Sequence, residues 1–160
     1  MSWIESCDVD GILITCTNYI AVMDEEMANR KVPIIKIDDP YFDYICHQEE
    51  PQFILFSNPK TVDGTMNRLK SYAKKIGKDI DVEVKILENT FHLAMEGKQE
   101  QYKQALMEQM THLIHEEKRH LSVAQLSMAE AAKEVEKQYH TKITTPLDLL
   151  VETVKKELYI

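Results

Sequence analysis

The chain has 160 residues, 44% of them apolar, which is enough to bury the core of one ordinary domain or of two small ones. Its net charge of −8 argues against nucleic acid as the main partner, because no basic stripe offsets the acidic residues. No apolar run is long enough to span a membrane, and three cysteines without CxxC spacing indicate neither a disulfide framework nor a zinc site. We therefore expect a soluble, cytoplasmic protein with reduced cysteines.

A short strand and a helix open the chain, and a cysteine lies between them. The apolar run at residues 11–15 is typical of a strand covered on both faces. Thr17 and Asn18 are common N-cap residues, and a helical pattern follows at residues 18–29. Cys16 is thus predicted at a helix N-terminus, where backbone N–H groups favour a thiolate or a bound carboxylate. The alternative is a small, buried, structural cysteine.

The rest of the chain alternates between strands and helices. In order, we expect a strand at 32–37, a helix at 40–47 with Asp39 as its N-cap, a strand at 53–56, a helix at 66–76, an edge strand at 82–86, a short helix at 91–97, a long helix at 102–114, a strand at 121–124, a helix at 128–135, a strand at 143–144 and a helix at 146–159 that Thr145 caps. Such alternation predicts an α/β fold with a mainly parallel sheet, whose ligands bind beyond the carboxyl ends of the strands.

A polar break at residues 48–51 marks a domain boundary. We expect a βαβα fragment at 1–49, a complete α/β domain with four strands at 50–144, and a closing helix at 145–160.

The sequence resembles the aspartate/glutamate and hydantoin racemase superfamily. The resemblance rests on ITCTNY (residues 14–19), VPIIKIDDP (32–40), ILFSNPKTVDGT (54–65) and VAQLSMAEAA (123–132), whose order and spacing match over essentially the whole chain. It implies flavodoxin-like parallel sheets in two pseudo-symmetric domains, with a cofactor-independent active site in the cleft between them. In that family a thiol from each domain flanks the α-carbon of the substrate, one removing a proton and the other returning it.

The resemblance also implies roles for individual residues. Cys16 corresponds to the thiol of the first domain, whereas Gln125 stands where the second thiol is expected. A glutamine can orient a substrate but cannot carry a proton, so two-thiol racemisation is not expected. The candidate substrate-binding residues, from this correspondence and from their hydroxyl and amide groups, are Thr17, Asn18, Asn58, Thr61, Thr65, Gln125 and Ser127.

Family members have a further strand-helix-strand stretch before the residues that match Met1. By resemblance the chain therefore holds a complete second domain and a truncated first half-domain, on which the closing helix packs. The strand at 11–15 would then have an open, apolar edge, which is a ready pairing site. We expect a homodimer that covers this edge.

Two functions stay open at this point. The first is a cofactor-independent, racemase-like protein that acts on or binds a small carboxylate such as aspartate or glutamate with one thiol; one-thiol decarboxylation is compatible with it. The second is a catalytically inactive member that binds a small carboxylate or a protein partner. The residues His112, His115, Glu116 and His120 are interpreted as a solvated helix face, not as a metal site.

Overall fold

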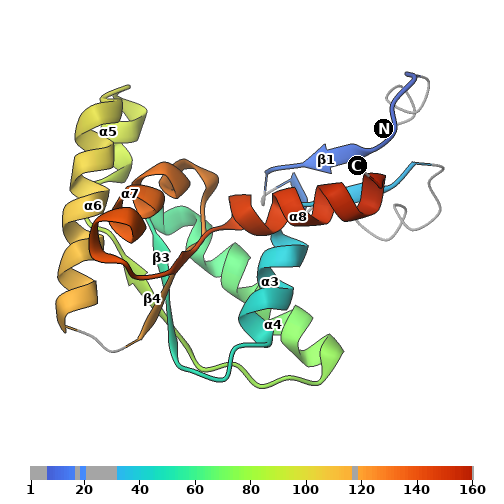
Figure 1. Ribbon diagram of the computed structural model, residues 1–160, viewed down its shortest axis with the longest axis horizontal. Helices are drawn as coiled ribbons and strands as arrows, with labels where there is room; N and C mark the ends of the chain where they lie inside the picture. Colours follow the sequence, from blue (N-terminus) through green and yellow to red (C-terminus); the bar gives the residue numbers. More distant parts are fainter. Residues whose placement is uncertain (1–6, 17–18, 21–31, 117–118, 160) are drawn as a thin grey trace.

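The computed structural model describes residues 7–16, 19–20, 32–116 and 119–159 (Figure 1). Within them, β1 (Ile12–Ile14) and β2 (Ile34–Lys36) form one parallel sheet. A second parallel sheet has the order β4-β3-β5-β6, formed by β3 (Gln52–Phe56), β4 (Val82–Ile86), β5 (His120–Val123) and β6 (Ile143–Thr144). The helices are α3 (Asp38–Cys46), α4 (Val62–Ile76), α5 (Phe91–Met95), α6 (Gln99–Glu116), α7 (Ala129–Tyr139) and α8 (Pro146–Leu158), and two 3-10 turns are η2 (Pro59–Thr61) and η3 (Leu126–Met128).

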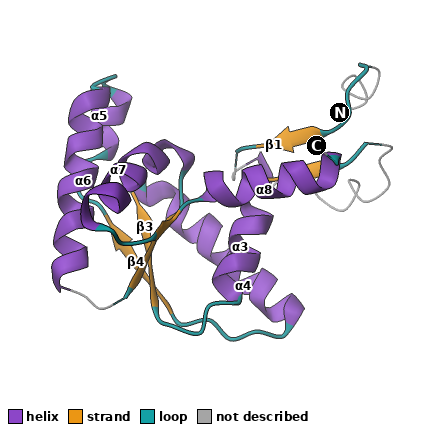
Figure 2. Ribbon diagram, in the orientation of Figure 1, coloured by secondary structure: helices purple, strands orange, loops and turns teal. Residues whose placement is uncertain are grey.

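The predicted fold class is confirmed. Both sheets are parallel, and helices connect the strands of the larger one (Figure 2). In the larger sheet the second strand in sequence is at one edge, followed by the first, third and fourth, which is the flavodoxin-like doubly wound order. That order reverses direction between β3 and β5, so a ligand site is expected beyond the carboxyl ends of these two strands.

The central strand β3 explains how the larger sheet is covered on both faces. All of its residues are buried, and successive side chains point to opposite faces, as strand geometry requires. Phe53 and Leu55 pack in a core with residues of α6 and α7. Ile54 and Phe56 pack in another core with residues of α3 and α4. The result is a sheet between two helical layers, which Figure 1 shows.

Strand β4 lies at the edge of this sheet, as its alternating pattern predicts. Val82 and Val84 pack toward the core formed with α3 and α4. The charged side chains Glu83 and Lys85 lie on the other face and form an ion pair of 2.8 Å.

The smaller sheet packs with the last helix. Ile12 and Ile14 of β1 and Ile35 of β2 form an apolar cluster with Leu150 of α8, which runs alongside the small sheet in Figure 1. Leu13, in contrast, is 46% exposed although it lies in a strand of the buried type. No helix among the described residues has the length and apolar character needed to cross a membrane.

The predicted start of α3 is wrong. The helix begins at Asp38, with Ile37 in the N-cap position and no side-chain cap, so Asp39 and Pro40 lie within its first turn. The chain passes directly from β2 into the helix at Ile37, which is buried in the cluster under α8. Pro40 fits the first turn because the N–H that it lacks would have no partner there.

Two other expectations are not tested: the helix at 18–29 and the domain boundary after residue 49. The helix at 18–29 lies outside the described residues except for residues 19–20. The domain boundary after residue 49 stays a prediction, because α3 lies before it and packs on β3 and α4.

Candidate functional site

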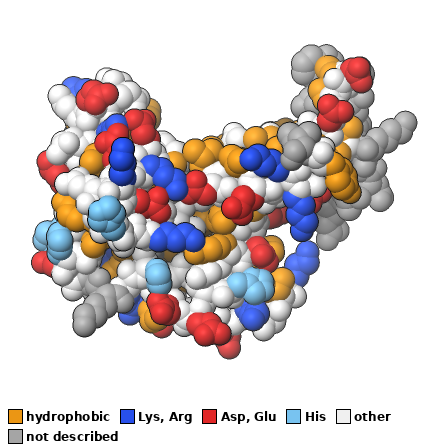
Figure 3. All heavy atoms as spheres, in the orientation of Figure 1, with side chains coloured by type: hydrophobic (Ala, Val, Ile, Leu, Met, Phe, Trp, Pro, Cys, Tyr) orange, Lys and Arg blue, Asp and Glu red, His pale blue; other side chains and the backbone are white. Residues whose placement is uncertain are grey.

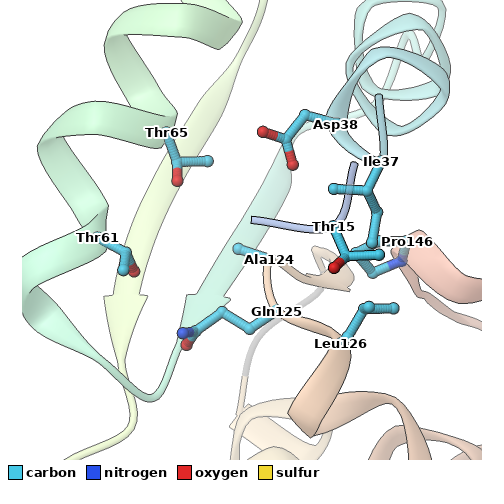
Figure 4. A pocket seen from close by; sticks show the side chains of 9 residues that line it. All are labelled: Thr15, Ile37, Asp38, Thr61, Thr65, Ala124, Gln125, Leu126 and Pro146. Atoms are coloured by element: carbon cyan, nitrogen blue, oxygen red, sulfur yellow. The ribbon is translucent and has the colours of Figure 1, made fainter. Parts of the chain in front are cut away.

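A pocket of about 130 Å³ lies where the carboxyl ends of the two sheets meet (Figure 4). This volume is several times what one water molecule needs, so the pocket suits a small molecule. Thr15 follows β1, Ile37 follows β2, and Ala124 follows β5, so strand ends from both sheets contribute. The complete lining is Thr15, Ile37, Asp38, Thr61, Thr65, Ala124, Gln125, Leu126 and Pro146. We call this cavity the strand-end pocket.

Polar groups in the strand-end pocket come from several elements. The carboxylate of Asp38, at the start of α3, is buried and forms an ion pair with Arg68 of α4. The Arg68 guanidinium also lies over the ring of Phe42, 5.3 Å from its centroid. Thr65, one turn of α4 before Arg68, is buried as well. Because the acid and the guanidinium neutralise each other, the pair holds a buried carboxylate in place without adding net charge.

The side chain of Gln125 is held by three hydrogen bonds at the end of β3. Its Oε1 accepts from the backbone N–H of Ser57 (2.8 Å), from the Ser57 hydroxyl (2.9 Å) and from the backbone N–H of Asn58 (3.1 Å). Backbone N–H groups only donate, so the atom that faces them must be the carbonyl oxygen. The amide Nε2 donates to no described residue, and Gln125 lines the pocket.

Tyr102 of α6 contacts the residues that hold the side chain of Gln125. Its buried hydroxyl donates to Ser57 Oγ at 3.0 Å and lies 3.1 Å from Ser127 Oγ. One phenol thus joins the loop after β3 to the loop after β5. These are the two loops that flank the point where the strand order reverses.

The structure brings together three of the predicted substrate-binding residues. Thr61, Thr65 and Gln125 all line the strand-end pocket, and Figure 4 shows their side chains around a common space. The backbone N–H of Asn58 donates to Gln125 Oε1. The side-chain oxygen of Asn58 accepts from the N–H of Lys60 at 3.1 Å and caps the turn η2. Ser127 is exposed and contacts Tyr102, and it does not line the pocket.

Cys16 lies beside the pocket. Its neighbour Thr15 is in the lining, Cys16 is not, and its side chain is exposed. The N–H of Ile20 donates to the Cys16 carbonyl at 2.9 Å, a bond that spans one helical turn, as expected at a helix start. Thr17 and Asn18 lie outside the described residues. The catalytic role of Cys16 and the binding roles of Thr17 and Asn18 stay predictions.

The sequence analysis does not single out Asp38, Tyr102, Ser57 or Arg68 as residues of the site. Asp38 was expected only as part of a helix start, although an acid at the carboxyl end of a buried strand is a signal for a site residue. Tyr102 was expected only as a member of an apolar helix stripe. A buried tyrosine usually needs a partner for its hydroxyl, and this rule indicates a polar contact without identifying the partner.

Comparison with known proteins supports the fold. No family model matches the sequence, and no curated protein matches it. Among solved structures, glutamate racemase from Francisella tularensis in complex with D-glutamate aligns with a TM-score of 0.65 and 15% identity, over 98% of this chain and 60% of that one. Allantoin racemase from Klebsiella pneumoniae aligns with a TM-score of 0.62 and 16% identity, over 93% of this chain and 59% of that one. Glutamate racemase from Campylobacter jejuni aligns with a TM-score of 0.61 and 15% identity, over 97% and 63%.

These findings define an α/β protein with doubly wound parallel strands and a pocket at their carboxyl ends. Its fold is shared with the glutamate and allantoin racemases of known structure, which agrees with the fold that the sequence resemblance implies. The chain spans about three fifths of the length of these solved racemases.

Proposed function

We propose that this protein binds a small amino acid in the strand-end pocket and does not carry out two-sided racemisation. The observation that carries the proposal is Gln125, which stands where the resemblance implies the second thiol. Its amide oxygen is held by three hydrogen bonds. An amide cannot take up or return a proton at an α-carbon near neutral pH, so one face of the substrate lacks a base.

The lining suits a zwitterion better than a bare anion. The carboxylate of Asp38 lines the pocket, and its pairing with Arg68 keeps the pocket close to neutral overall, which suits a ligand without net charge. Thr65 and Gln125 provide hydroxyl and amide groups for a carboxylate, whereas the Thr61 hydroxyl donates to the Asn58 carbonyl at 2.9 Å. Aspartate and glutamate are the first ligands to test, because glutamate racemases share the fold.

One-thiol chemistry at Cys16 is the second candidate. The observation that favours it is position: Cys16 is exposed and directly follows Thr15, which lines the pocket. A single thiol could return one proton to one face of an enediolate, as a decarboxylase requires, without a partner thiol.

Proton exchange in D₂O tests the proposal. D- and L-aspartate and D- and L-glutamate would each be incubated with the protein while NMR follows both the α-proton signal and ligand binding. We expect binding of at least one of these amino acids and no loss of its α-proton signal. Matched variants are Cys16→Ser, which should bind equally, and Gln125→Cys, which restores a thiol and could raise exchange. Rapid exchange with inversion by the unmodified protein would contradict the proposal, and no binding of any small amino acid would overturn it.

We further propose that the protein is a cytoplasmic homodimer. The supporting observations are the exposed Leu13 on β1 and the absence of a disulfide at Cys7, Cys16 and Cys46 in the described part of the chain, which suits a reducing compartment.

A further inference from the structure

Three hydrogen-bond donors converge on one point at the carboxyl end of β3. They are the backbone N–H groups of Ser57 and Asn58 and the hydroxyl of Ser57, all within 3.1 Å of the same oxygen. Such a cradle is suited to an oxygen of a bound carboxylate, since consecutive backbone donors favour anions. In this chain the oxygen that fills the cradle belongs to Gln125 itself.

The polarity of the surrounding bonds fixes which way the amide faces. Tyr102 donates to Ser57 Oγ, and Ser57 Oγ in turn donates to Gln125 Oε1. Both Ser57 and Tyr102 are 3% exposed, so this chain of bonds is inside the protein and shielded from water. Each donor in such a chain strengthens the next, and the amide cannot flip without leaving two backbone N–H groups facing an NH₂ group.

The remaining polar group of Gln125 is its amide nitrogen, which donates to no described residue. No buried side-chain nitrogen or oxygen among the described residues lacks a partner, so this nitrogen must be accessible. Because Gln125 lines the strand-end pocket, a small ligand there can reach it (Figure 4).

We propose that Gln125 is the specificity-determining residue of this pocket: its carbonyl oxygen closes the donor cradle at the end of β3, and its amide nitrogen binds the carboxylate of the ligand instead. This inference rests on the proposed function, because it names the group that recognises the amino acid there. It implies that the ligand carboxylate is bound by a neutral amide that the protein holds in a single orientation.

Gln125→Glu is the sharpest test. The new carboxylate keeps an oxygen in the cradle, where it accepts from the same donors, so the fold should persist. It replaces the NH₂ donor with a second acceptor that repels a ligand carboxylate. With L-aspartate as the probe, we expect the affinity to fall at least about tenfold, since a hydrogen bond to a charged group contributes about 1.5–3 kcal/mol. The matched control is Gln101→Glu, which adds the same charge on an exposed residue of α6 and should leave the affinity unchanged.

A spectroscopic measurement on the unmodified protein keeps the inference testable if the variant fails to fold. The side-chain amide signals of Gln125 should shift when aspartate is added. If aspartate shifts the NMR signals of Thr61 and Thr65 but not those of the Gln125 side-chain amide, this inference is overturned and the proposed function still stands. Equal affinity of Gln125→Glu and the unmodified protein would have the same consequence. If aspartate and the other small amino acids shift none of these signals, the proposed function and this inference both fall.

Discussion

The cysteines differ in the environment that surrounds each thiol. Cys46 is 3% exposed on α3, and burial raises the pKa of its thiol, as does the negative charge of Asp43. Cys7 and Cys16 are exposed. Since the thiolate is the reactive form, both burial and a raised pKa make Cys46 slow to react.

Alkylation of the native protein should separate these thiols. We expect iodoacetamide near neutral pH to modify Cys7 and Cys16 and to reach Cys46 only after denaturation. Mass spectrometry of proteolytic peptides gives the measurement, and Cys46→Ser, which should label like the unmodified protein, is the control. Labelling of Cys46 at the rate of Cys16 in the folded state would show that α3 does not protect it. An accessible Cys16 is also a condition for any one-thiol reaction.

At the scale of residues, the sequence predicts which residues line the pocket better than it predicts the contacts between them. Thr61, Thr65 and Gln125 are predicted from the resemblance, and all line the pocket. The hydrogen bonds from Ser57 to Gln125 join residues 68 positions apart and depend on the register of β3 against β5. No local pattern encodes such a contact. The pairing of Asp38 with Arg68 is missed for the same reason.

The start of α8 joins the larger sheet to the smaller one. Thr145 directly follows β6 and is fully buried, and its hydroxyl oxygen accepts from Asp148 N–H at 3.3 Å. The hydroxyl also donates to the Asp148 carboxylate at 2.9 Å, which completes the cap that the sequence predicts. The helix then carries Leu150 into the cluster with β1 and β2.

Removing this cap should destabilise the protein measurably. We expect Thr145→Ala to lower the free energy of unfolding by about 1 kcal/mol, the usual cost of losing an N-cap side chain. Thr145→Ser keeps the hydroxyl and should recover most of the loss. The control on the same helix is Thr153→Ala, whose hydroxyl donates only to the Leu149 carbonyl and should matter little. Urea unfolding followed by circular dichroism measures all three, and equal stability of Thr145→Ala and the unmodified protein would contradict the capping role.

At the scale of elements, buried runs and helical stripes predict the order of strands and helices well. The FILF run becomes the fully buried β3, and the alternating residues 82–86 become the edge strand β4. The start of α3 is predicted two residues late, because Asp-Asp-Pro suggests a capped helix after a loop. In the structure no loop separates β2 from α3, and a direct turn of this kind leaves no signal in residue type.

In the part of the chain that the structure describes, one sheet is covered on both faces and the other less completely. Among the described residues, β1 pairs only with β2, and Leu13 remains 46% exposed. Within the described residues, the other edge of β1 presents unpaired backbone groups, and Leu13 presents apolar surface on the face opposite Ile12 and Ile14; both features favour association. The described part of the chain therefore provides a reason for self-association that local sequence patterns alone do not.

We expect a homodimer at micromolar concentration, with β1 and its neighbours in the interface. Burying apolar surface contributes about 25 cal/mol per Å², so an interface that covers this face of β1 as well as its edge gains from burying Leu13. Leu13→Asp places a charge there and should shift sedimentation velocity profiles toward monomer. The matched control is Met95→Asp, at an exposed apolar residue of α5 (72% exposed), which should leave the dimer intact. A monodisperse monomer of the unmodified protein at these concentrations, or equal dissociation by both variants, would show that the β1 edge is not an interface. On the face that Figure 3 shows, exposed hydrophobic side chains are scattered among charged ones, so an effect confined to Leu13→Asp would indicate a specific interface at β1 and not nonspecific hydrophobic association.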